Sequence, residues 1–316
     1  MPESRPSHLS AILSLAAIAA VWGGGFPATK YCLQAGLSVG ALLTLRFAIG
    51  AAGLGLFMLA FRVPLRRRAV VDGLWLGLVL ATLFWLQTDG LRFTTASKSG
   101  FITGLYVIFT PAVALLAGDR LRPSHGLGAL VALAGLVLLV REPGAAWGGW
   151  NRGDSETFLA AILCGVHIVL TAHFSRRSSG WVLAFMQVAV TGLISLAVTL
   201  ALPAPHGFQG AGAALSQGGT WVSLAFMGLL ATTLAFYVQS TMQARLSATE
   251  SAILFSTEPV WTAAIAISGW VPGVREHLAP SQLAGGLLIL AATLVAELGP
   301  RLLRRLQRPE AEEAIG

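Results

Sequence analysis

The sequence has little charge and few cysteines. Only 11% of its 316 residues are Asp, Glu, Lys or Arg, while 55% are hydrophobic. A water-soluble domain carries roughly 25% charged residues, so the composition excludes a soluble protein and indicates an integral membrane protein. The two cysteines, Cys32 and Cys164, fall in or beside different apolar segments without metal-ligand or redox spacing, and we interpret them as small packing residues.

Long hydrophobic segments fill almost the whole chain. A helix needs about 20 apolar residues to cross the hydrocarbon core of a bilayer. Lys30 and Gln34 follow the first segment where a signal-peptide cleavage site would need small residues, so we expect that segment to be retained. Only short loops remain, which leaves no room for a soluble catalytic domain. We count ten segments, approximately 9–31, 39–61, 70–90, 99–117, 124–141, 157–175, 180–202, 219–242, 250–271 and 279–298.

The basic residues indicate topology rather than nucleic-acid binding. The net charge of +7 comes from short clusters between apolar segments, not from one soluble face. With the N-terminus placed in the cytoplasm, 14 basic residues fall on inner segments and six on outer ones. This bias predicts that both termini face the cytoplasm and that the number of spans is even.

Two stretches of the chain resemble each other. L91RFTTASKSGFITGLYVIFTP and A244RLSATESAILFSTEP share an arginine, a small polar cluster, an apolar run and a proline. Five helices per copy is an odd number, so the second copy would enter the membrane from the opposite side, as in many secondary transporters. We therefore expect an all-α integral membrane protein with ten transmembrane helices in two inverted five-helix repeats. The expected divisions are a first repeat over 1–141, a linker over 142–156, a second repeat over 157–298 and a basic and acidic cytoplasmic tail over 299–316.

The order of several short motifs resembles one known family. W22GGGF, L45RF, the stretch from Leu91 to Pro111, and T257EPV are similar to the EamA-type branch of the drug/metabolite transporter superfamily, and the likeness covers almost the entire chain. The resemblance implies an exporter of small metabolites in a bacterial-type inner membrane, with a central cavity between its two halves. Family members handle amino acids, other metabolites and drugs. Eight residues separate Pro111 from Asp119, whereas 17 separate Pro259 from Glu276, so we expect unusual helix ends in one half or both.

Glu258 lies deep in an apolar segment. An ionisable group at that depth costs at least ~2.5 kcal/mol unless it is paired or hydrated, so we expect it to face a cavity or a partner. It could contact a substrate amine or carry protons, or it could form a hydrogen-bonded lock, for which Arg46 is the natural partner. Arg46 could instead bind a substrate carboxylate or extend to the membrane interface. Pro259 frees a backbone carbonyl near the same place.

Other candidate cavity residues are aromatic or polar. Trp22 and Phe26 share a helix face beside three glycines, which indicates either a close helix contact or stacking on an apolar substrate. His167, in the middle of its segment, is the second candidate for proton coupling, or it hydrogen-bonds a neighbouring helix. No second ligand is spaced for a metal site with it. Four further residues complete the set: Trp85, Tyr237, Gln239 and Trp261.

Asp89 and Arg92 are three residues apart at the predicted outer end of one helix. They could neutralise each other there or form part of an outer gate, and Lys98 could join them.

The leading functional hypothesis is a secondary transporter that exports amino acids, related metabolites or amphipathic drugs by alternating access. No P-loop is present, so ATP is not the direct energy source. An intramembrane enzyme would need clustered catalytic groups that the sequence does not show, and it stays an alternative together with a non-transporting receptor. The expected partners are a small-molecule solute and the lipid bilayer, without nucleic acid or cofactor. A homodimer is left open.

Overall fold

The computed structural model describes residues 7–118, 130–131, 134–135, 137–138, 149–202 and 207–292. These residues form helices joined by short connections and contain no β-strand. Eight helical segments are long and apolar enough to cross a membrane: His8–Gln34, Val39–Ala60, Arg67–Gly90, Ala96–Leu116, Arg152–Ser175, Gly180–Ala201, Gly218–Arg245 and Ala248–Ser268. A shorter apolar helix covers Pro280–Ala292.

Eight of the predicted spans thus correspond to observed helical segments. The predicted span 124–141 lies largely outside the described residues, as does the end of the predicted span 279–298. The count of ten helices stays a prediction, and so does the inverted repeat.

The elements follow the chain as a series of α-helices, one π-helix and one 3₁₀ turn. They are α1 (His8–Gln34), α2 (Val39–Ala60), α3 (Arg67–Gly90), α4 (Ala96–Thr103), α5 (Tyr106–Leu116), α7 (Arg152–Ser175), α8 (Gly180–Ala201), α9 (Ala211–Leu215), α10 (Gly218–Ala225), the π-helix η1 (Phe226–Leu234), α11 (Ala235–Met242), the 3₁₀ turn η2 (Gln243–Arg245), α12 (Ala248–Phe255) and α13 (Glu258–Ser268).

Polar caps determine where several helices begin. Ser38 accepts a hydrogen bond from the backbone of Ala41 at the start of α2. Asn151 and Asp154 form a capping box at the start of α7, and Ser247 forms another at the start of α12. Such caps satisfy backbone N–H groups that have no partner within the helix.

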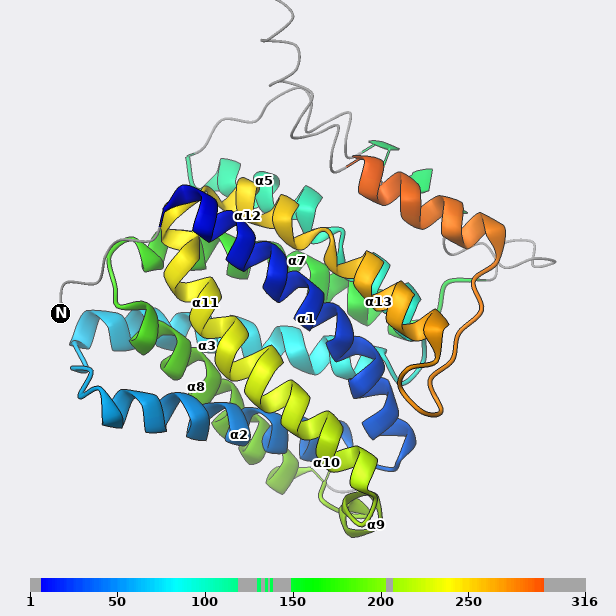
Figure 1. Ribbon diagram of the computed structural model, residues 1–316, viewed down its shortest axis with the longest axis horizontal. Helices are drawn as coiled ribbons and strands as arrows, with labels where there is room; N and C mark the ends of the chain where they lie inside the picture. Colours follow the sequence, from blue (N-terminus) through cyan, green and yellow to red (C-terminus); the bar gives the residue numbers. More distant parts are fainter. Residues whose placement is uncertain are drawn as a thin grey trace, which may run out of the picture.

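Helices from the N-terminal part of the sequence (α1 to α5) pack mainly on helices from the C-terminal part (α7 to α13). In Figure 1, α1 lies beside α11 and α13, and α2 lies beside α8. α3 packs against both α7 and α8. Close approach at small residues allows this: a Cβ atom at Gly77 of α3 would lie 2.6 Å from the Cβ of Val190. The space enclosed by the fold is therefore walled by elements from both parts.

Two predicted continuous spans are interrupted. The segment 96–116 breaks between α4 and α5 at Gly104 and Leu105, and the segment 248–268 breaks between α12 and α13 at Ser256 and Thr257. The two breaks touch, because a Cβ atom at Gly104 would lie 2.8 Å from Cγ of Pro259. Pro259 cannot donate the backbone hydrogen bond that would continue α12 into α13.

Candidate functional site

A cavity lies beside the two helix breaks. Its empty space is about 730 Å³ with the open mouth included. α1, α2, α3, α7, α11 and the two broken helices all contribute to its wall. The lining residues are Trp22, Gly25, Phe26, Thr29, Arg46, Leu80, Leu83, Phe84, Gln87, Thr88, Leu91, Thr103, Tyr106, Cys164, His167, Ile168, Phe236, Gln239, Phe255 and Glu258.

Aromatic rings form a large part of this wall. The indole of Trp22 lies 5.1 Å from the ring of Phe255 and 5.7 Å from that of Phe236, and Phe84 lies 6.3 Å from Phe236. Trp22 is held in place by a hydrogen bond of 3.0 Å from its Nε1 to the carbonyl oxygen of Ala231 in η1. π-Helical turns of this kind occur frequently at functional sites. The arrangement offers flat apolar surfaces for a planar ligand.

Arg46 brings a positive charge to the cavity. Its Nε donates a hydrogen bond of 3.1 Å to the hydroxyl of Thr232, and its guanidinium lies 4.5 Å from the ring centre of Phe84. The residue is 5% exposed, so the side chain lies within the protein rather than extending to the membrane interface. It forms no ion pair with any described carboxylate.

Glu258 brings a carboxyl group to the same cavity from the first turn of α13. It is 8% exposed and accepts a hydrogen bond of 3.3 Å from the hydroxyl of Tyr106, at the start of α5. The two residues next to the helix breaks therefore contact each other. Within the described residues, Glu258 forms no ion pair, so the lock that the sequence suggested between it and Arg46 is not a direct one.

His167 is held in a hydrogen-bonded chain across three helices. Its Nε2 lies 2.7 Å from Oε1 of Gln187 on α8, and Nε2 of Gln187 donates a bond of 3.0 Å to the hydroxyl of Ser240 on α11. With the amide in this orientation, His167 donates through Nε2. The contact matches the expected bond to a neighbouring helix, while proton coupling through His167 stays a prediction.

Six of the nine predicted cavity residues lie on this cavity and three do not. Those on it are Trp22, Phe26, Arg46, His167, Gln239 and Glu258. Trp85 packs against the apolar core formed by α2, α3 and α8. The ring of Tyr237 stacks on Trp181 at 3.8 Å, and Trp261 is 47% exposed with its Cβ against Gly23 of α1. That any of these residues binds substrate stays a prediction.

Sequence reasoning missed several aromatic residues of the wall. Phe236 stands three residues before Gln239 in one helix, a spacing that places both side chains on one face, so the pattern could have identified it. Phe255 and Glu258 have the same spacing but lie on opposite sides of a helix break. Phe84 and Tyr106 carried no such signal, because their place depends on contacts with elements distant in the sequence.

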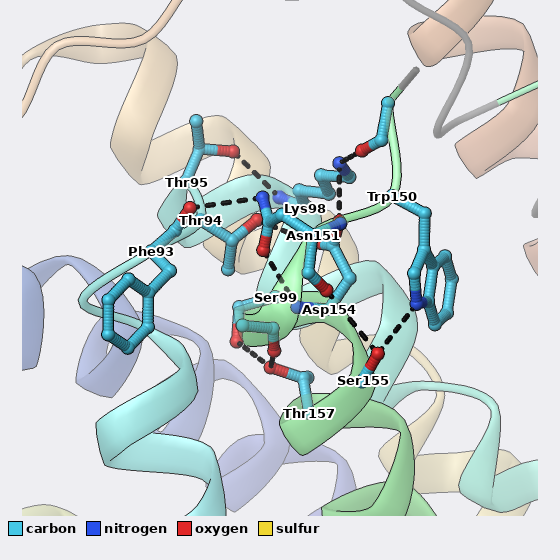
Figure 2. A network of polar contacts seen from close by, with 12 residues as sticks. Phe93, Thr94, Thr95, Lys98, Ser99, Trp150, Asn151, Asp154, Ser155 and Thr157 are labelled. Carbon is cyan, nitrogen blue, oxygen red and sulfur yellow. Dashed lines mark hydrogen bonds and ion pairs between the residues drawn. The ribbon is translucent and has the colours of Figure 1, made fainter. Parts of the chain in front are cut away.

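A second, partly buried polar site lies near the starts of α4 and α7, where Asp89, Lys98 and Asp154 are buried and Arg92 and Arg152 are exposed. We call Asp89, Arg92, Lys98, Arg152 and Asp154 the Lys98 cluster. Nζ of Lys98 lies 2.8 Å from Oδ2 of Asp154 and also donates to the carbonyl oxygen of Gly149 (Figure 2). The hydroxyl of Thr94 donates a bond of 2.8 Å to Oδ1 of the same aspartate.

The remaining charges of the Lys98 cluster also pair directly. Asp89 lies 2.9 Å from Arg92 and 2.7 Å from Arg152. The predicted neutralisation between Asp89 and Arg92 is therefore present, while Lys98 pairs with Asp154 rather than with Asp89. A gating role for these residues stays a prediction.

These features define a multi-span helical membrane protein with a central aromatic cavity. The chain matches the EamA-like transporter family over residues 9–141 and 151–297. It is 30% identical over 292 residues to an uncharacterized transporter of Archaeoglobus fulgidus, in an alignment that covers 92% of this chain and 87% of that protein. The chain therefore belongs to the EamA-like transporter family and is a membrane transporter.

Two further proteins are similar. An aromatic amino acid exporter, YddG, of Ancylobacter novellus is 28% identical over 220 residues, covering 66% of this chain and 70% of that protein. A solved crystal structure of a protein has the same fold, with a TM-score of 0.66 at 21% identity, over 95% of this chain and 99% of that one.

Proposed function

We propose that this chain is a secondary transporter that exports small organic metabolites across the inner membrane by alternating access, with both termini in the cytoplasm. Its substrate site is the cavity beside the two helix breaks. Discontinuous helices that meet near the middle of the membrane are a recurring way to build substrate sites in secondary transporters. The breaks at Gly104 and before Glu258 support this assignment.

The substrate class follows from the charges in the cavity. Arg46 and Glu258 present opposite charges to one aromatic-lined space without forming an ion pair. This observation carries the proposal, because buried charges are costly unless a partner satisfies them. A zwitterionic amino acid supplies both partners: its carboxylate would bind Arg46 and its ammonium would bind Glu258. Guanidinium groups suit carboxylates because they donate two parallel hydrogen bonds.

The aromatic wall favours an aromatic side chain on that amino acid. Phe84 lies next to Arg46, and Phe236 and Trp22 extend the aromatic wall away from it, so an aromatic ring bound there would gain stability beyond its apolar area. The similarity to a protein described as an aromatic amino acid exporter supports the same substrate class. Proton coupling through Glu258 or His167 remains part of the proposal.

Transport itself can be tested by counterflow in proteoliposomes. Vesicles loaded with unlabelled tryptophan should accumulate labelled tryptophan, and external phenylalanine or tyrosine should compete, whereas glutamate and lysine should not. Protein-free vesicles prepared in parallel give the background. Reconstituted, folded protein that shows no saturable uptake of any amino acid in the panel would contradict the proposed function.

A further inference from the structure

Gln239 is an unusual member of the cavity wall. It is 2% exposed, and its side-chain carbonyl oxygen has no hydrogen-bond partner. Six buried side-chain atoms lack a partner in the described part of the chain, and Gln239 is the only cavity-lining residue among them. Buried polar atoms are nearly always hydrogen-bonded, so each exception calls for a missing partner.

With the amide in this orientation, the missing partner is a donor, because an amide oxygen only accepts. Two other polar side chains of the wall, His167 and Tyr106, already hydrogen-bond other residues. His167 contacts Gln187, which also donates to Ser240, and the hydroxyl of Tyr106 donates to Glu258. The protein therefore supplies an acceptor at this place without supplying the donor.

The position of Gln239 relative to Arg46 indicates where the donor would come from. Arg46 hydrogen-bonds Thr232 near the end of the π-helix η1. Phe236 and Gln239 follow in α11, and both line the same cavity as Arg46. Seven residues of helix span roughly 10 Å at 1.5 Å per residue. Phe236 lies between the two polar ends and faces the cavity.

An extended aromatic amino acid fits this pattern. Its carboxylate would lie at Arg46, its ring beside Phe236, and the far edge of its ring at Gln239. We propose that Gln239 is a specificity-determining residue, an inference that rests on the proposed function. Its side-chain oxygen accepts a hydrogen bond from a donor on the substrate ring, such as an indole N–H or a phenol O–H. The transporter then prefers tryptophan and tyrosine to analogues without that donor.

The reason for selectivity is the unsatisfied oxygen. A substrate with a ring donor satisfies the buried carbonyl of Gln239, whereas a substrate without one covers the carbonyl and leaves it unpaired. Sites built to hydrogen-bond a substrate group discriminate strongly against analogues that lack it. We expect roughly tenfold preference per hydrogen bond.

The test compares two matched substrate pairs in counterflow: tryptophan with 1-methyltryptophan, and tyrosine with phenylalanine. Wild-type protein should prefer the donor-bearing member of each pair roughly tenfold. Gln239→Met keeps the length of the side chain and removes the acceptor, so both ratios should fall to about one. A purely structural role for Gln239 would lower transport of all four compounds and leave the ratios unchanged, and that result would overturn the proposal.

Gln243→Met is the matched control. Gln243 stands one turn further along, is equally buried and also has an unpartnered carbonyl oxygen. It does not line the cavity, and its amide nitrogen donates to the carbonyl oxygen of Ile168, a bond that Gln243→Met also removes. Its substitution should leave both substrate ratios as in the wild type. If Gln239→Met does not fold, Gln239→Asn withdraws the amide by one methylene and should lower the same ratios.

The outcomes separate this inference from the proposed function. Saturable transport with equal rates for both members of each pair in the wild type would overturn the role of Gln239 and leave the transporter intact. A donor preference that persists in Gln239→Met would place the acceptor elsewhere and overturn it as well. Absence of saturable uptake for all four compounds would contradict the proposed function itself.

Discussion

The central cavity and the Lys98 cluster both bury charged side chains, but they satisfy the charges differently. In the Lys98 cluster, Lys98 and Asp154 lie 2.8 Å apart, Lys98 also donates to the carbonyl oxygen of Gly149, and Asp154 also accepts from Thr94. In the cavity, Arg46 and Glu258 each hydrogen-bond a neutral hydroxyl group, Arg46 also lies over the ring of Phe84, and neither forms an ion pair with described residues.

The difference suggests two purposes for buried charge in one membrane protein. A charge that the fold has already neutralised can hold helices together, and removing its partner leaves an uncompensated buried ion. A charge that the fold has left without a counter-ion can be neutralised by a ligand. The four predictions that follow test this distinction, from the largest expected effect to the smallest.

The largest effect is expected in the Lys98 cluster. Asp154→Asn leaves the ammonium of Lys98 buried without its counter-ion, and breaking a buried pair costs about 3–5 kcal/mol. Unfolding of the purified protein in detergent should show this loss of stability. Combining Asp154→Asn with Lys98→Met removes both charges and should restore much of it. If Asp154→Asn alone is as stable as the wild type, that result would contradict a structural role for the pair of Lys98 and Asp154.

Arg46→Met should lower transport with little effect on stability, the opposite of what we expect for Asp154→Asn. It removes a buried charge that forms no ion pair with described residues, so the loss of stability should be much smaller than in Asp154→Asn. Transport efficiency for tryptophan should fall roughly 10- to 100-fold, because a hydrogen bond to a charged group contributes about 1.5–3 kcal/mol. Counterflow and detergent unfolding on the same preparation measure both. A strongly destabilised variant with normal transport per folded molecule would argue against the comparison.

Glu258→Gln tests whether the carboxyl group of Glu258 binds the substrate. If Glu258 binds the substrate ammonium, the KM for tryptophan should rise roughly tenfold, while inhibition by indole-3-propionate, which lacks the amine, should change little. Stability should be retained, because the side-chain oxygen can still accept from Tyr106.

The same variant separates two other interpretations of Glu258. If the acid carries protons, uptake driven by a pH gradient should be lost while counterflow persists. If the acid only holds helices in place, unfolding should occur at lower temperature and both kinds of transport should fall together.

Tyr106→Phe is expected to have the smallest effect. It removes one hydroxyl that donates to Glu258 and leaves the ring in place. A single hydrogen bond contributes about 0.5–1.5 kcal/mol, so the KM for tryptophan should change by less than about tenfold. Initial rates of counterflow over a range of concentrations measure this. A change larger than that of Glu258→Gln would mean that Tyr106 acts on the substrate directly.

The sequence predicted the features that depend on local pattern. Hydrophobic length identified the eight spans in the described part, and an ionisable residue deep in an apolar segment identified Glu258 as a cavity residue. Arg46 and His167 followed from the same reasoning. These inferences work because the cost of burying a charge in hydrocarbon depends mainly on depth, which the sequence contains.

Features that depend on distant contacts were not predictable. The helix break at Gly104 does not coincide with Pro111, the proline inside α5. It lies instead where the backbone of Gly104 packs closely against Pro259. The π-helix η1 and the pairing of Lys98 with Asp154 likewise depend on neighbours far along the chain. Trp85, Tyr237 and Trp261 stand at plausible helical spacing, yet each side chain packs elsewhere.

The most direct test of the central claim is the thermal stability of the wild-type protein in detergent with three related ligands. A ligand that binds the folded state raises its unfolding temperature according to its affinity. Tryptophan can satisfy both Arg46 and Glu258, tryptamine only Glu258, and indole-3-propionate only Arg46. At equal concentration, tryptophan should raise the unfolding temperature more than either analogue. Equal shifts for all three ligands, or a larger shift with an analogue, would contradict recognition of a zwitterion by this pair of charges.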